Sequence, residues 1–163
     1  MKRALVVGID NYPKHPLSKC VNDAIAIGTV LETLGNGDPN FSVVTLTSQD
    51  QEVSSEVLHD AVARLFSGDA ETVLFYFAGH GIINRNTNTG HIVAQDGRSG
   101  GWGMSLEEIL AHANNAYPNI QSSVIILDSC HSGYAGEVAG LGSKEVSANG
   151  TGVTILTASH REG

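Results

Sequence analysis

The sequence predicts an α/β domain with a mostly parallel sheet that is covered by helices on both faces. Short apolar runs alternate along the chain with segments in which apolar residues recur at helical spacing. That order is typical of parallel strands joined by crossover helices. The apolar runs are also nearly continuous, without alternating polar residues, which favours strands buried on both of their faces.

Three strands and two helices are predicted in the first half of the chain. Gly35 and Gly37 are expected to end the first helix, and Ser54 or Ser55 is the expected cap of the second. The strands are expected at residues 4–9, 41–46 and 72–78, and the helices between them at residues 21–34 and 53–66.

The second half of the chain continues the same alternation. Ser105 followed by Glu108 forms the Ser-x-x-Glu pattern of a capping box at the start of a third helix. Residues 84–103 and 134–152 are rich in glycine and polar residues, and we expect long loops there, which in compact domains often carry function. A short strand or hairpin arm is expected at residues 91–94, the helix at 105–114, and further strands at 124–127 and 153–158.

Length and composition are those of one folded domain, which we take as residues 1–163. Hydrophobic residues make up 41% of the chain and charged residues 16%, a composition that excludes a disordered chain. A formal net charge of -8 without any run of Lys or Arg argues against nucleic acid as a partner. The same charge is compatible with basic peptides as substrates.

Two features point away from a membrane protein or a secreted protein. No run approaches the roughly 20 apolar residues of a membrane-spanning helix. The first apolar run ends at Asp10, too early for the roughly 7–15 apolar residues of a secretory signal. We therefore expect no membrane partner and a cytoplasmic location.

Cys20 and Cys130 are the two cysteines, and three interpretations are open for them. A disulfide between them is the first, and two separate thiols are favoured over it in a cytoplasmic protein. Zinc is the third, with His80 and His131 as further ligands. No C-x-x-C or H-x-x-x-H spacing is present, so a structural zinc site is disfavoured.

Reactive side chains follow two of the predicted strands. His80, between Gly79 and Gly81, comes directly after the third strand, and Cys130 comes shortly after the strand at 124–127. Ligands bind beyond the carboxyl ends of parallel strands, so neighbouring strands would bring this imidazole and thiol together. An imidazole beside a thiol activates the sulfur as a nucleophile. Each residue alone is more often structural, but their joint placement favours a catalytic pair.

Four segments carry a resemblance to a known family. Residues 76–81, Tyr-Phe-Ala-Gly-His-Gly, and 128–133, Asp-Ser-Cys-His-Ser-Gly, closely resemble the two catalytic motifs of metacaspases and bacterial caspase-like peptidases, the orthocaspases. Residues 4–12 and 20–24 resemble the family's first strand and first helix. The histidine precedes the cysteine by 50 residues, as in caspases, although the signature around the cysteine of animal caspases is absent. The resemblance implies a caspase-like three-layer α-β-α sandwich, of which this chain is the large-subunit portion.

The resemblance also implies a cysteine endopeptidase and assigns roles to particular residues. Cys130 would attack the scissile carbonyl group, and His80 would act first as a base and then as an acid toward the leaving amine. Backbone N–H groups of Gly81 and Cys130 would form the oxyanion hole.

The family's acidic pocket, which receives the side chain before the cleaved bond, matches Asp23 and Asp128 in this sequence, with Cys20 at the pocket wall. A partly desolvated pair of carboxylates binds a guanidinium or ammonium group well, so cleavage after Arg or Lys is expected. The alternative is structural: Asp23 would cap the first helix and Asp128 would brace a loop.

The sequence departs from the family where some metacaspases bind calcium. Asp96 is kept, but Gly103, Met104 and Ser105 stand where paired aspartates are expected. A hard cation such as calcium needs six or more oxygen ligands. We therefore expect no cofactor, and activity without calcium.

Residues 157–163 resemble the end of the family's large subunit. The resemblance implies a small subunit from the C-terminal part of the same precursor and a polypeptide substrate. Many prokaryotic relatives are attached to sensor modules, so a sensor or adaptor domain is a further expected partner. Lys144 and Arg161 are candidate self-processing sites if cleavage after basic residues holds.

Two other functions are compatible with the fold class. A non-catalytic caspase-like signalling scaffold would act by binding, but it has no chemical need for both His80 and Cys130. A nucleotide-binding module is disfavoured because no G-x-G-x-x-G or P-loop sequence follows any strand.

Overall fold

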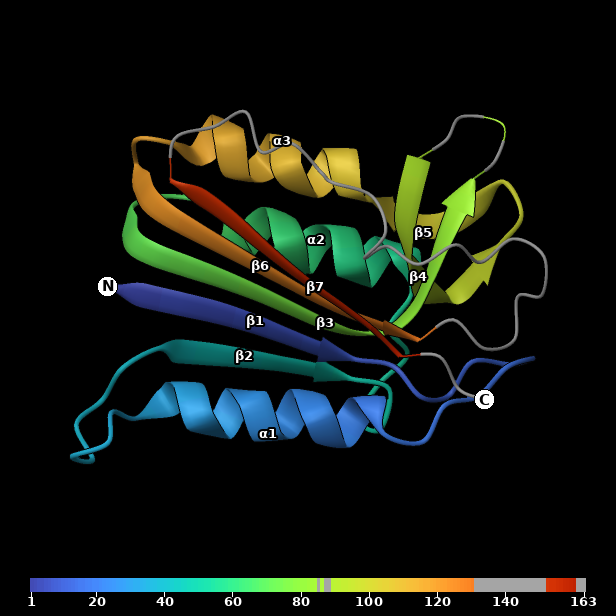
Figure 1. Cartoon of the computed structure of the whole chain (residues 1–163), viewed down its shortest axis with the longest axis horizontal. Coiled ribbons are helices and arrows are strands. Elements are labelled where there is room, and N and C mark those ends of the chain that lie inside the picture. Colours follow the sequence, from blue (N-terminus) through green and yellow to red (C-terminus); the bar gives the residue numbers. More distant parts are fainter. Residues whose placement is uncertain (85, 87–88, 131–151, 161–163) are drawn as a thin grey trace.

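The computed structural model describes residues 1–84, 86, 89–130 and 152–160, and Figure 1 shows the order of the elements in them. The predicted alternation of strands and helices is confirmed. The elements are β1 (Lys2–Gly8), α1 (Cys20–Glu32), β2 (Ser42–Thr47), α2 (Ser55–Leu65), β3 (Ala70–Asn84), β4 (Thr89–Arg98), β5 (Gly101–Ser105), α3 (Leu106–Ala116), β6 (Ile120–Cys130) and β7 (Val153–His160).

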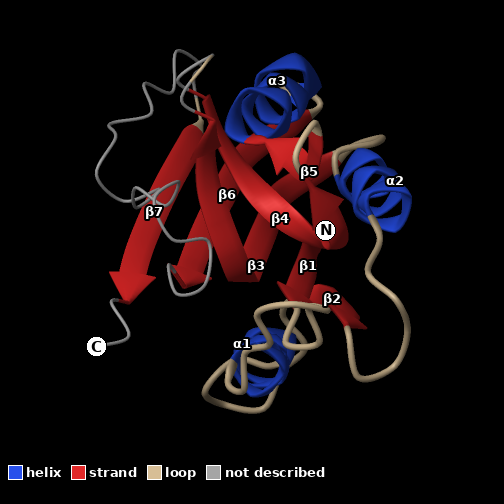
Figure 2. Ribbon diagram, turned by 90° about the vertical axis from the view of Figure 1, so that its right-hand side faces the viewer, coloured by secondary structure: helices blue, strands red, loops and turns tan. Residues whose placement is uncertain are grey.

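Five strands form a parallel sheet in the order β2-β1-β3-β6-β7. Figure 2 shows α1 on one face of this sheet and α2 with α3 on the other, so the three-layer α/β class is confirmed. Among the described strands, β2 and β7 lie at the two edges of this sheet. The central strand β3 is buried over most of its length, as the near-continuous apolar run 72–78 predicts.

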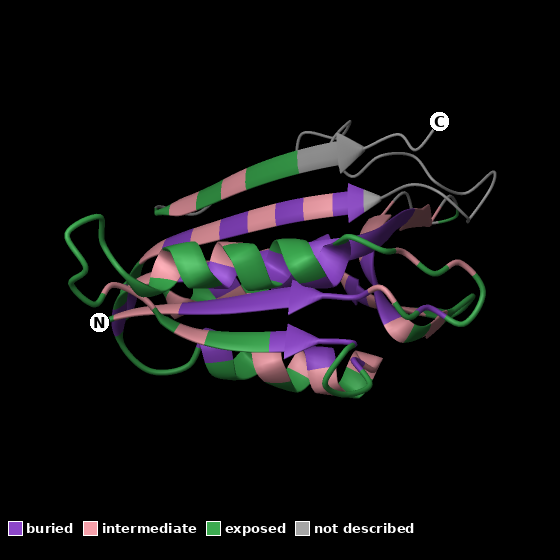
Figure 3. Ribbon diagram, turned by 90° about the horizontal axis from the view of Figure 1, so that it is seen from below, coloured by how far each residue is buried: buried purple, intermediate pink, exposed green. Residues whose placement is uncertain are grey.

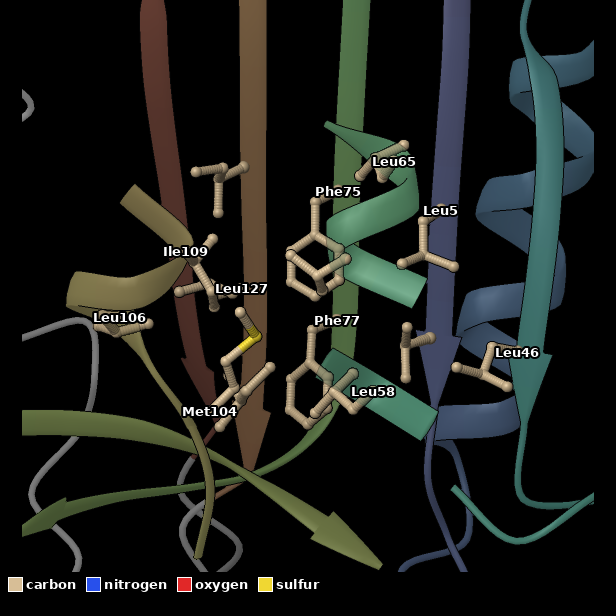
Figure 4. Packing of buried hydrophobic residues seen from close by; sticks show 14 of the residues in the cluster. Leu5, Leu46, Leu58, Leu65, Phe75, Phe77, Met104, Leu106, Ile109 and Leu127 are labelled. Atoms are coloured by element: carbon tan, nitrogen blue, oxygen red, sulfur yellow. The ribbon is translucent and has the colours of Figure 1, made fainter. Parts of the chain in front are cut away.

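The larger of two hydrophobic clusters lies between the sheet and the helices α2 and α3. Phe75 and Phe77 of β3 are fully buried at its centre, with Leu58 of α2 and Ile109 of α3 packed near them (Figure 4). A smaller cluster, which includes Ala24 of α1, fills the other face. Burying a Leu, Ile or Phe side chain stabilises the fold by about 1.5–3 kcal/mol. The two hydrophobic clusters therefore hold the strands of the sheet in place.

The stretch 84–103 was predicted as a long loop with a short strand or hairpin arm at 91–94; the strand is confirmed as part of β4, but most of the remaining stretch also belongs to strands, not to a loop. The last residues of β3, from Gly81 to Asn84, pair with β4 in antiparallel order, and β4 pairs with β5. Gly103 permits the close approach of β4 and β5, because a side chain there would begin 2.3 Å from the carbonyl oxygen of Ile92. Glycine-rich composition therefore marks tight strand packing here, not a loop. The second predicted loop, 134–152, lies outside the described residues except for Gly152.

The helix starts agree with their predicted caps. The Ser54 hydroxyl accepts a hydrogen bond from the N–H of Val57 at 3.2 Å, and the Ser105 hydroxyl accepts one from the N–H of Glu108 at 3.1 Å. The end of α1 was predicted wrongly, because the helix stops at Glu32, before either glycine. Within the ranges that the structure describes, no helix has the length and apolar character needed to cross a bilayer.

Candidate active site

The parallel pairing of β3 with β6 places the two predicted catalytic residues side by side. In the register of these strands, Ala78 lies opposite Asp128 and His80 lies opposite Cys130. Both residues lie at the carboxyl end of the parallel part of the sheet, where β3 and β6 run together in Figure 1. The expected meeting of His80 and Cys130 at neighbouring strand ends therefore holds for their backbone positions.

The His80 ring is oriented by a backbone carbonyl group. The ring is completely buried, and its Nε2 lies 2.7 Å from the carbonyl oxygen of His15. A carbonyl oxygen can only accept, so Nε2 carries the proton in this bond. In the neutral ring the lone pair is then on Nδ1, which is the nitrogen able to take a proton from a thiol.

Tyr12 forms a hydrogen bond with the backbone of His80, and this role was not predicted from the sequence. Its hydroxyl accepts a hydrogen bond from the N–H of His80 at 3.0 Å and donates one to the carbonyl oxygen of Val93 at 2.8 Å. The rings of Tyr12 and His80 are also in contact, with centroids 4.5 Å apart. The only signal in the sequence is the position of Tyr12 just after the first strand, which does not reveal a contact 68 residues away.

The position of Tyr12 leaves no room for a side chain at Gly79. A side chain at Gly79 would begin 2.5 Å from the Tyr12 hydroxyl oxygen. Gly79 and Gly81 both lie inside the continuous strand β3, and Gly81 pairs with Ile92 of β4. The role of the Gly81 N–H in an oxyanion hole stays a prediction.

Replacing Tyr12 by Phe should destabilise the protein and misplace His80. The variant Tyr12→Phe removes the hydrogen-bond partner of two buried backbone groups, each worth about 1–3 kcal/mol. We expect the free energy of unfolding to fall by about 2–6 kcal/mol in urea titrations. Tyr117→Phe is the matched control, because Tyr117 is exposed. Equal stability of the two variants would contradict the positioning role.

Asp10 fixes the start of α1 at the edge of the site. Its Oδ1 accepts a hydrogen bond from the N–H of Cys20 at 2.9 Å, and its Oδ2 accepts one from the N–H of Val21 at 3.2 Å. This carboxylate satisfies two N–H groups of the first turn and suits the positive end of the helix dipole. The alternative in which Asp23 caps the first helix is therefore wrong. Asp23 lies within α1 and is exposed.

The three residues predicted for the acidic pocket all act electrostatically on the hydroxyl of Tyr76. Tyr76 is buried in β3 and donates a hydrogen bond to Oδ2 of the half-buried Asp128 at 3.3 Å. Burial raises the pKa of Tyr76 above its ordinary value, and the negative charges of Asp128 and Asp23, with a smaller effect of Cys20, raise the pKa further. The two carboxylates and the Cys20 thiol are thus close enough to act on one hydroxyl group.

Tyr76→Phe should change the stability of the protein in a pH-dependent way. The raised pKa favours the protonated hydroxyl in the fold, so this contribution is complete below pH about 10 and is lost as the pH rises above it. At pH 7 we expect the variant to lose about 1–2 kcal/mol of unfolding free energy through the missing hydrogen bond. The difference from the unmodified protein should shrink between pH 10 and 11. A difference that grows over this range, relative to Tyr117→Phe, would contradict the assignment.

The remaining candidates are placed as follows. Cys20 is buried and is a thiol, not half of a disulfide. Nothing is described for the side chain of Cys130, and His131, Lys144 and Arg161 lie outside the described residues. Asp96, the acidic residue that the sequence shares with the calcium site of some metacaspases, is exposed. Its carboxylate accepts a hydrogen bond from the N–H of Ser55 at 2.8 Å, at the start of α2. In the part of the chain that is described, no group of three His, Cys, Asp or Glu side chains is arranged to hold a metal ion.

One solved structure with a similar fold is the protein GSU0716 from Geobacter sulfurreducens, at a TM-score of 0.57 and 21% sequence identity. The similarity covers 81% of this chain and 51% of that one, so this chain spans about half the length of its neighbour. At that identity the comparison shows a shared fold alone. No curated protein matches the sequence. Residues 1–160 match the Peptidase C14 family, the caspase domain, and the chain therefore belongs to this family of caspase-like peptidases.

Proposed function

We propose that the chain is the catalytic part of a cysteine endopeptidase that cleaves polypeptides after Arg or Lys. The observation that carries the proposal is the register of β3 and β6, in which His80 and Cys130 are direct neighbours. A Peptidase C14 domain that keeps both residues at adjacent strand ends has the groups required for thiol catalysis.

In the proposed reaction, Cys130 Sγ attacks the carbonyl carbon of the scissile bond while His80 Nδ1 takes the thiol proton. The N–H groups of Gly81 and Cys130 would stabilise the oxyanion. His80 then gives its proton to the leaving amine as the C–N bond breaks, and water hydrolyses the thioester. The hydrogen bond from Nε2 to the His15 carbonyl oxygen supports this assignment, because it leaves Nδ1 as the unprotonated nitrogen of the neutral ring.

Specificity for a basic side chain is proposed from the charge around Tyr76. Asp23 and Asp128 both act on that hydroxyl, and a substrate cation placed between the carboxylates would be attracted to both. The proposed partners are a polypeptide substrate, a small subunit from the same precursor and a sensor or adaptor domain. The proposed setting is the cytoplasm, where thiols stay reduced.

A panel of fluorogenic peptides tests the proposal. The peptides carry Arg, Lys or Asp before the cleaved bond and are assayed with calcium and with a chelator. We expect turnover of the Arg and Lys peptides at similar rates in both conditions. Preference for Asp would contradict the acidic pocket, dependence on calcium would contradict the cofactor prediction, and binding without cleavage would favour the signalling scaffold.

A further inference from the structure

The sheet carries an open groove beside β2, on the face covered by α2 and far from His80. The groove has a volume of about 200 Å³, and we call it the β2 groove. Arg3 and Leu5 of β1, Ser42 and Val44 of β2, and Arg64 and Leu65 of α2 line it. In the parallel register Arg3 lies opposite Ser42 and Leu5 lies opposite Val44, which gives the groove a polar layer and an apolar layer.

β2 forms an edge that can accept another strand. Among the described strands it pairs only with β1, and Figure 3 shows it exposed along its first part and buried at its end. Val44 is 61% exposed although it is apolar. Edge strands are commonly protected by Lys, Pro or a bulge, but β2 reads Ser-Val-Val-Thr-Leu-Thr and has an unbroken register with β1. An unprotected edge of this kind is suited to strand addition.

The charges of the groove favour an acidic occupant. Two guanidinium groups, of Arg3 and Arg64, line it in a chain whose net charge is -8. Among the described residues, neither arginine is paired with a carboxylate. Arg3 Nη2 donates to the carbonyl oxygen of Leu65 at 3.1 Å, which holds the guanidinium at the end of α2. Arg3 Nε is buried and has no hydrogen-bond acceptor among the described residues.

We propose that the edge of β2 binds an extended acidic segment of a partner protein as an added strand. Side chains on one face of a strand are about 7 Å apart, two residues along the chain. An apolar side chain beside Val44 would fill the groove, and an acidic side chain two residues away, beside Ser42, would meet Arg3 and Arg64. The recognised pattern is therefore an apolar residue and an acidic residue separated by one position.

A second copy of this chain fits the groove less well than such a segment. Antiparallel pairing of two β2 edges about a two-fold axis would place both grooves on the same face. Four guanidinium groups would then lie along one seam without carboxylates, and like charges at that distance repel. The charge thus favours a different, acidic chain.

The probe for the test is a fluorescein-labelled peptide, Thr-Glu-Thr-Phe-Thr-Glu-Thr, whose symmetric pattern suits either strand direction. Binding to the purified protein is measured by fluorescence polarisation. We expect Val44→Lys and Arg64→Glu to weaken binding about tenfold or more. Val30→Lys and Arg98→Glu are the matched controls, because both residues are exposed on other elements, and they should bind as the unmodified protein does.

Two altered peptides separate strand addition from simple contact with the groove. The first has N-methyl groups on the backbone positions that would face β2, and the second has Lys in place of Glu. Both should lose binding, the first through missing main-chain hydrogen bonds and the second through charge repulsion. The proposal is overturned if no binding is seen, if Val44→Lys and Arg64→Glu bind normally, or if the N-methylated peptide binds equally well. It is also overturned if light scattering shows a dimer of the unmodified protein and a monomer of Val44→Lys, since the occupant of the β2 groove is then a second copy of this chain.

Discussion

Cys130→Ala is expected to lower kcat/KM for an Arg-containing peptide by about 10⁴-fold or more, because it removes the nucleophile itself. His80→Gln should produce a loss of similar order, since residues of one catalytic unit do not contribute additively. Both variants should keep the unfolding free energy of the unmodified protein within about 2 kcal/mol. His91→Gln is the matched control, because His91 is a half-buried histidine on the adjacent strand β4 and has no proposed role in the reaction.

A second measurement separates catalysis from structure in the same variants. Iodoacetamide alkylates a thiolate much faster than a thiol, and the rate at Cys130 is followed by mass spectrometry of the peptide that contains it. In His80→Gln this rate should fall near neutral pH, because the imidazole no longer removes the thiol proton. The Cys20 peptide, measured in the same digest, is the internal reference. An unchanged alkylation rate at Cys130 together with unchanged hydrolysis would remove the basis of the proposed dyad.

The fold and the neighbouring backbone positions of His80 and Cys130 were predictable because their signals are local. An apolar run such as 72–78 indicates a buried strand by itself, and residues that follow two such runs must meet at one sheet edge if the strands are neighbours. Ser54 and Ser105 reveal their caps within three residues of chain. Strand register was not predictable, because it depends on how β3 and β6 pack on their helices.

The supports of the site were not predictable because they join distant residues. Tyr12 contacts His80 across 68 residues and Val93 across 81, and His15 reaches the same ring through a backbone oxygen that any residue would supply. Asp10 caps α1 from ten residues away, so no capping pattern appears next to the helix. β5 was missed because Gly101 and Gly103 are read as loop signals, whereas the small size of Gly103 serves close strand pairing.

Asp128→Asn should lower kcat/KM for Arg and Lys peptides by about 10–100-fold, because a charge-assisted hydrogen bond is worth about 1.5–3 kcal/mol. Asn keeps the size of Asp, and Tyr76 can still donate its hydrogen bond to the amide oxygen. Asp23→Asn should cost less, since Asp23 is exposed and its charge is better screened by water. The assay compares each variant on peptides that carry Arg or norleucine before the cleaved bond.

The norleucine peptide decides what Asp128 does. Norleucine has an apolar side chain of similar reach without the cation, so its hydrolysis should be nearly unchanged in Asp128→Asn if the carboxylate acts through charge. An equal loss on both peptides would mean that Asp128 shapes the backbone next to Cys130, two residues along β6. The double variant Asp23→Asn, Asp128→Asn then measures coupling: a loss smaller than the product of the single losses is expected, because in the proposed pocket both carboxylates would face one substrate cation.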